Sequence, residues 1–142
     1  MIVNTAYIYM GGGGTPVNPN LWQDGVSNYP VVFTNSSISA AGLNFSAPAG
    51  DATFSELPLT YFNRLTLSGK STGPGATSKV KITIEFYSKD NVLIGTKTVE
   101  FLRSENSVAV DIPSSAKIQN AKIKIKKAAY GNSSIFSSAV LS

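Results

Sequence analysis

The residues that could do chemistry in this chain are limited first by two residue types that are missing. None of the 142 residues is histidine or cysteine. Histidine is the commonest general base near neutral pH and the commonest metal ligand, while cysteine supplies thiolate nucleophiles, sulfur ligands and disulfides. A Ser-His-Asp triad, a Cys-His pair and a thiolate-bound metal are therefore excluded.

For the hydrolysis of sugars, paired carboxylates are the one catalytic arrangement left. Glycoside hydrolysis needs two acidic side chains that flank the scissile bond. The acidic residues are Asp24, Asp51, Glu56, Glu85, Asp90, Glu100, Glu105 and Asp111. Glu85 and Glu100 lie on neighbouring predicted strands among lysines and threonines. We expect them to form cross-strand ion pairs with Lys81 or Lys97 instead of a catalytic pair. We therefore predict a protein that is not an enzyme.

Oxygen ligands and glycine-rich loops suggest two further kinds of site. Loop carbonyls together with Asp24, Asp51 or Asp90 could hold calcium, although no EF-hand spacing is present. Residues 11–14 are four glycines and residues 69–71 are Gly-Lys-Ser. Neither stretch has the spacing and the following helix of a phosphate-binding loop. We predict no cofactor and keep calcium as an open alternative.

Aromatic side chains could form a binding surface, because a flat ring and a few placed polar groups suit a sugar ligand. Trp22 is the only tryptophan. It has two interpretations: a core residue at the end of a loop, or a platform that stacks on a sugar or on another protein. The candidate stacking residues are Trp22, Tyr29, Tyr61, Tyr87 and Tyr130.

Lysines mark another candidate surface. The net charge is +4, but residues 1–63 carry −3 and residues 64–142 carry +7. Lys122, Lys124 and Lys126 alternate with apolar residues, which predicts a strand with lysines on its outer face. The row either protects an edge against aggregation or faces an anionic partner. Nucleic acid fits this row poorly, because aromatic residues that would stack on bases are not interleaved with the lysines.

The elements that must position these side chains are β-strands, and the strongest signal covers residues 79–102. Strict alternation at positions 80–87 predicts a strand with one apolar and one polar face. Turn residues 89–91 and a second strand follow, which predicts an antiparallel hairpin with one solvated face. Gly95 lies inside the second strand and marks a bulge or a close backbone approach.

The remaining strands are shorter. We predict them at residues 2–10, 31–34, 43–46, 59–68, 108–112, 121–127 and 135–141, with loops at 53–58 and 69–78. Eight or nine short strands without an amphipathic helix predict an all-β, antiparallel, jelly-roll-like sandwich. Residues 1–30 are expected to form an N-terminal strand and a Gly/Pro-rich arm or loop. Residues 31–142 are expected to form the sandwich of one compact domain.

Targeting signals are not evident. The opening MIVNTAYIYM lacks the basic region of a signal peptide. No run approaches the roughly 20 apolar residues of a membrane span. We therefore expect synthesis in the cytoplasm and no membrane partner.

Two family resemblances rest on pattern. Residues 80–95 (VKITIEFYSKDNVLIG), followed by residues 108–113 and 121–125, resemble the central hairpin and closing strands of galactose-binding-like and carbohydrate-binding β-sandwiches. The opening NTAYIYMGGGG, the pair Leu21 and Trp22, and residues 59–67 resemble small accessory proteins of tailed-bacteriophage virions.

The virion resemblance implies a non-enzymatic structural module of a phage particle: a capsid decoration, head-fibre or tail-attached protein with weak adhesion to bacterial surface glycans. Its partners would be other virion proteins and copies of itself, and its location the virion. The alternative is a stand-alone carbohydrate-binding module. The predicted attachment arm, which would add a strand to a partner's sheet, comprises Val3, Tyr7, Ile8, Tyr9, Gly11 and Gly12.

Overall fold

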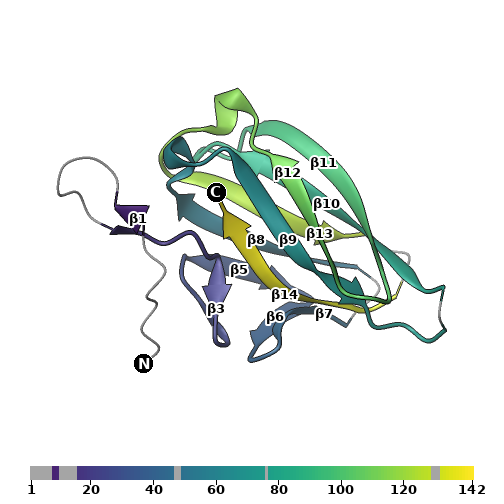
Figure 1. Ribbon diagram of the computed structural model, residues 1–142. Helices are drawn as coiled ribbons and strands as arrows, with labels where there is room; N and C mark the ends of the chain where they lie inside the picture. Colours follow the sequence, from purple (N-terminus) through teal and green to yellow (C-terminus); the bar gives the residue numbers. More distant parts are fainter. Residues whose placement is uncertain (1–7, 10–15, 47–48, 76, 129–131) are drawn as a thin grey trace.

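The computed structural model describes residues 8–9, 16–46, 49–75, 77–128 and 132–142. Two five-stranded antiparallel sheets pack face to face around one apolar core (Figure 1). The predicted all-β antiparallel sandwich is confirmed, with ten strands in the two sheets instead of eight or nine. No helix in the described ranges is long and apolar enough to cross a membrane.

The first sheet contains β5 (Val31–Thr34), β8 (Gly50–Leu57), β10 (Lys79–Tyr87), β11 (Leu93–Leu102) and β13 (Ala121–Lys127). The second contains β6 (Ser36–Ser39), β7 (Gly42–Phe45), β9 (Arg64–Ser71), β12 (Asn106–Asp111) and β14 (Ser134–Leu141). Two short two-stranded sheets lie outside these five-stranded sheets. One pairs β1 (Ile8–Tyr9) with β2 (Pro16–Val17), and the other pairs β3 (Trp22–Gln23) with β4 (Val26–Ser27). Two 3-10 turns complete the set, η1 (Leu59–Tyr61) and η2 (Ser114–Ala116).

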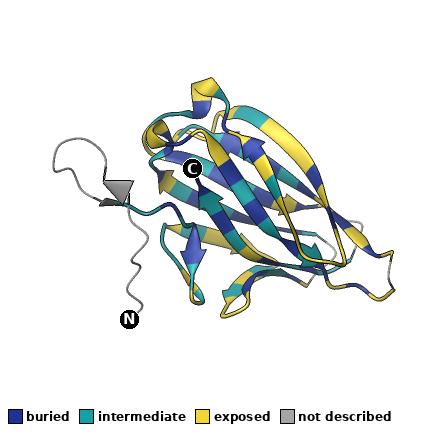
Figure 2. Ribbon diagram, viewed as in Figure 1, coloured by how far each residue is buried: buried dark blue, intermediate teal, exposed yellow. Residues whose placement is uncertain are grey.

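The strand order shows the jelly-roll arrangement. The first sheet has the order β11-β10-β13-β8-β5 and the second β12-β9-β14-β7-β6. Except for the hairpins β10-β11 and β6-β7, neighbouring strands come from distant parts of the sequence, so the chain crosses repeatedly between the sheets. Figure 2 shows the result as buried and exposed stripes that alternate along the strands.

The predicted hairpin at residues 79–102 is confirmed as β10 paired with β11. Phe86 pairs with Gly95 and Tyr87 pairs with Leu93, so the register shifts at Ile94 and forms a bulge. A Cβ atom on Gly95 would lie 2.9 Å from Cγ of Pro113. Gly95 therefore marks both a bulge and a close approach, as its position predicts.

Two segments differ from the sequence prediction. Residues 53–57 of the predicted loop at 53–58 belong to β8. Glu56 has a φ of 57°, and the register with β13 shifts there, which breaks the alternation after Phe54. Residues 59–61 form η1 and not the start of a strand, because Leu59 and Phe62 are both buried at a spacing of three residues.

Strand β9 also runs to Ser71, three residues into the predicted loop at 69–78. Gly69 makes this extension possible, because a Cβ atom there would lie 2.3 Å from Cδ1 of Phe136. The close approach lets β9 continue its pairing with β14 through Ser71.

The segment around Trp22 is part of the sandwich. Leu21 N donates to Ala139 O at 2.9 Å, and Leu141 N donates to Pro19 O at 2.7 Å, so this segment lies against β14. Trp22 is 3% exposed, its ring stacks on Phe54 at a centroid distance of 5.8 Å, and Nε1 donates to Ser137 O at 3.1 Å. Of the two interpretations of Trp22, the structure supports the core residue.

Replacing Trp22 tests this packing. We expect Trp22→Ala to lower the free energy of unfolding by about 3–5 kcal/mol, because it leaves a large cavity and removes the indole hydrogen bond. Urea denaturation followed by far-UV circular dichroism measures the change. Val92→Ala is the control: Val92 is 60% exposed, and its loss should change stability by about 0.5 kcal/mol or less. Equal effects of the two substitutions would contradict the packing described.

Candidate functional site

The outer face of the first sheet collects polar side chains from all five strands. Successive residues of a strand point to opposite faces, so residues paired across strands share a face. One row across the sheet is Thr96, Glu85, Lys124, Thr53 and Val32. The next row is Thr98, Thr83, Lys126, Asp51 and Thr34. The opposite parity of the central strands carries the core residues Ile84, Ile125 and Ala52.

Tyr87 is the aromatic residue of this face. It ends β10 and pairs with Lys122 on β13. Its hydroxyl donates to Oε1 of Glu85 at 2.8 Å, two residues earlier on the same strand. Lys124 Nζ lies over the ring, 5.4 Å from its centroid, within the range of a cation–π contact. The hydrogen bond thus holds the hydroxyl end of the ring, and the Lys124 ammonium covers one ring face.

The surroundings of Tyr87 favour the neutral phenol. Burial raises the pKa of Tyr87 above its usual 10.0, and the hydrogen bond to Glu85 raises it further. The negative charges of Glu85 and Asp51 act in the same direction, because a nearby anion opposes formation of a phenolate. Tyr87 therefore stays protonated and keeps its hydroxyl committed to Glu85.

The turn between β10 and β11 places an amide beside the ring. Ser88 N donates to Val92 O at 2.9 Å, and Ser88 Oγ accepts from the backbone N–H groups of Asp90 and Val92 at 3.2 Å. Asn91 has a φ of 65°, in the left-handed region that asparagine tolerates. Its Oδ1 accepts a hydrogen bond from Lys122 Nζ at 2.7 Å.

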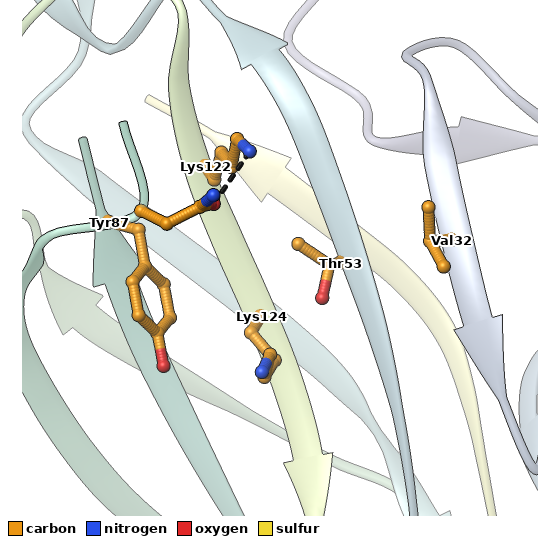
Figure 3. Close-up of a pocket in the computed structure, with 6 residues that line it drawn as sticks. Val32, Thr53, Tyr87, Lys122 and Lys124 are labelled. Atoms are coloured by element: carbon orange, nitrogen blue, oxygen red, sulfur yellow. Dashed lines mark hydrogen bonds between the residues drawn. The ribbon is translucent and has the colours of Figure 1, made fainter. Parts of the chain in front are cut away.

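These groups surround a shallow hollow of about 310 Å³, lined by Val32, Thr53, Tyr87, Asn91, Lys122 and Lys124 (Figure 3). The hollow reaches across three strand spacings from β10 to β5, or about 14 Å. It offers an aromatic ring, two ammonium groups, an amide, a hydroxyl and an aliphatic side chain. This chemistry suits the binding of an extended polar ligand on an open face.

The predicted stacking residues are distributed unequally. Tyr87 lies in the hollow. Trp22 is 3% exposed, which favours its interpretation as a core residue over that as a stacking platform. Tyr29 is half-buried, packs on the core and donates its hydroxyl to Asn18 O at 2.6 Å. Tyr61 is 39% exposed on η1, away from the hollow. Tyr130 lies outside the described residues.

Most of the predicted attachment arm also lies outside the described residues, namely Val3, Tyr7, Gly11 and Gly12. The backbones of Ile8 and Tyr9 form β1, which pairs with β2.

The predicted carboxylate partners are corrected. Glu100 lies opposite Lys81 in the strand pairing, but its salt bridge is to Lys79 at 3.9 Å. Glu85 accepts the hydroxyl of Tyr87, and neither acid forms a salt bridge with Lys81 or Lys97 among the described residues. The register explains the difference at Lys97: it lies opposite Ile84, on the inward parity of the edge strand β11. An inward lysine on an edge strand protects the sheet from adding another strand.

The predicted calcium ligands gain no support. Asp24 lies in the β3–β4 turn, Asp51 on β8 and Asp90 in the β10–β11 turn. The described ranges contain no group of three acidic side chains that could hold a metal ion.

Sequence reasoning missed part of the hollow. The alternation at residues 121–127 predicts that Lys122 and Lys124 share a face, and this is confirmed. Thr53, Val32 and Asn91 were not predicted, because only the pairing of β5, β8 and β13 and the fold of the turn bring them there. Residues 53–58 were predicted as a loop, so Thr53 was not assigned to a strand face.

No protein-family model and no curated protein matches this sequence. Among solved structures, TmCBM61 in complex with β-1,4-galactotriose is similar at 15% identity over 88% of this chain and 94% of that chain, with a TM-score of 0.51. The family 11 carbohydrate-binding module from Clostridium thermocellum, in complex with a β-1,3-1,4-mixed-linked tetrasaccharide, has 10% identity over 79% and 81% and a TM-score of 0.49.

The chain therefore has the fold of a carbohydrate-binding module: an antiparallel jelly-roll sandwich of two five-stranded sheets. The enzymatically active domain of bacteriophage CBA120 tailspike protein 4 is also similar, with 13% identity over 80% of this chain and 18% of that chain. Its TM-score of 0.44 is too low to support the predicted virion role.

Replacing Glu85 tests the electrostatics of the hollow. We expect Glu85→Gln to lower the pKa of Tyr87 toward 10.0, because it removes both a charged acceptor and a negative charge. A raised pKa in the folded state stabilises the protein up to the usual pKa of tyrosine, and this contribution is lost as the pH rises through the raised value. NMR titration of ring-labelled tyrosine measures the shift. Glu105→Gln, which is exposed and removes the same charge, should leave the pKa of Tyr87 unchanged.

Proposed function

We propose that the protein binds glycans on the outer face of its first sheet. The observation that carries this proposal is the position of Tyr87, which lies at the edge of an open hollow among hydrogen-bonding groups from several strands. Sugars present flat apolar patches and many hydroxyls, so they bind where an aromatic ring is surrounded by polar groups. The likeness in fold to carbohydrate-binding modules is consistent with this proposal.

The hollow suits binding and not hydrolysis. Glycoside hydrolysis needs two carboxyl groups on either side of the bond to be cleaved. None of the six residues that line the hollow is acidic, and the neighbouring Glu85 accepts the Tyr87 hydroxyl. Lysine, amide and hydroxyl groups remain to bind sugar hydroxyls.

Glycan binding is favoured over the role in a phage particle. The virion interpretation rests on a pattern resemblance of the opening residues, of Leu21 and Trp22, and of residues 59–67. Most of the opening residues lie outside the described ranges. The glycan-binding proposal rests on a described surface with defined contacts. Location in a virion and binding to other virion proteins remain predictions from the sequence.

A glycan array followed by isothermal titration calorimetry tests the proposal. We expect the protein to bind an oligosaccharide, and Tyr87→Ala to weaken this binding. Loss of a buried aromatic contact costs about 1.5–3 kcal/mol, which is roughly tenfold to a hundredfold in Kd. Tyr61→Ala removes an exposed tyrosine outside the hollow and should leave Kd unchanged. Binding that survives Tyr87→Ala would place the glycan elsewhere.

A further inference from the structure

We propose that the ligand of this hollow is an acidic glycan whose sugars carry carboxylates, as in chains of uronic acids. This inference rests on the proposed function and names its ligand class. Its basis is the pair Lys122 and Lys124, which lie two residues apart on β13 and both line the hollow (Figure 3). Their Cα atoms are about 7 Å apart along the strand, so the two flexible side chains can reach one carboxylate or two adjacent ones.

The groups in direct contact with these two lysines are neutral. Lys122 Nζ donates to the neutral amide of Asn91, and Lys124 Nζ lies over the neutral ring of Tyr87. Within the described part of the chain, neither lysine lies in a salt bridge. Glu85 pairs with Lys124 in register, but its carboxylate accepts the Tyr87 hydroxyl at 2.8 Å. Glu85 keeps its negative charge in this hydrogen bond, so it offsets only part of the positive charge of the two lysines.

The contacts also hold both ammonium groups beside the hollow before a ligand arrives. A hydrogen bond of 2.7 Å and a cation–π contact restrict two side chains that would otherwise lose much rotamer freedom on binding. An ammonium–carboxylate contact is a charge-assisted hydrogen bond, which is stronger than one to a sugar hydroxyl. The site therefore favours a charged sugar over its neutral counterpart.

The outer face of the second sheet provides a contrast. Its described outward residues are mainly serine, threonine and asparagine, among them Asn44, Thr66, Ser68 and Ser107. Arg64 on that face is paired with Asp111 at 3.2 Å. Lys70 is the one lysine on the described strands of that sheet and lies opposite Ile135. The first sheet instead gathers several lysines beside Tyr87, which is where a charged sugar would meet both groups.

The test compares short oligogalacturonates with the same oligomers after full methyl esterification, which removes the charge and keeps the sugar backbone. Oligoalginate and oligohyaluronate extend the set of uronates. We expect at least one uronate to bind about tenfold or more tightly than its neutral ester, with an affinity that falls as NaCl is raised. The double variant Lys122→Gln/Lys124→Gln should remove this preference.

The matched control is Lys81→Gln/Lys126→Gln, which removes the same charge from the same face outside the hollow. It should retain the preference, and thermal unfolding should show that both double variants are folded. The inference would be overturned if both double variants lost the preference for uronates equally, or if polyglutamate bound as tightly as the uronates. Either result would mean that the face attracts anions in general.

Two further outcomes separate this inference from the proposed function. In the first outcome, neutral glycans bind, Tyr87→Ala abolishes their binding, and the lysine substitutions have no effect. Glycan binding then stands, and the inference of an acidic ligand is wrong. If neither neutral nor acidic glycans bind, both proposals are wrong.

Discussion

The pairing of β13 between β10 and β8 is the interaction on which the rest of the structure depends. Its inward residues Ile123 and Ile125 are buried in the core, while Lys122 and Lys124 alternate with them on the outer face. The side-chain period of a strand is two, so a slip of one residue would turn the isoleucines to solvent and the lysines to the core. The free energy of burying the isoleucines therefore also fixes the position of the two lysines that line the hollow.

The second sheet holds this arrangement through one aromatic cluster. Phe136 on β14 packs edge-on against Phe45 and Phe101, at centroid distances of 5.9 Å and 5.0 Å. Phe101 belongs to the first sheet, so the cluster joins the two layers. Two glycines make room for β14: a Cβ atom on Gly69 would lie 2.3 Å from Phe136 Cδ1, and one on Gly42 would lie 2.0 Å from Phe136 O. The first sheet thus rests on a closely packed support.

The sequence predicts those parts of the fold whose signal is local. Alternation alone predicts β10, β11 and β13, and with them the shared face of Lys122 and Lys124. It fails in β8, because the bulge at Glu56 breaks the period. It also leaves Trp22 undecided, because the contact with Phe54 joins segments far apart in the chain. Thr53 and Val32 enter the hollow only through strand pairing, which one sequence does not reveal.

The hollow is built almost wholly on strands, with only Asn91 supplied by a turn. Because outward and inward positions alternate, the chain separates the residues that line the hollow from those that pack the core. Thr53, Lys122 and Lys124 can each be exchanged while the intervening core residues stay in place. The sandwich is therefore a framework on which specificity can diversify by single substitutions at alternate positions, without insertions and without remodelling of loops.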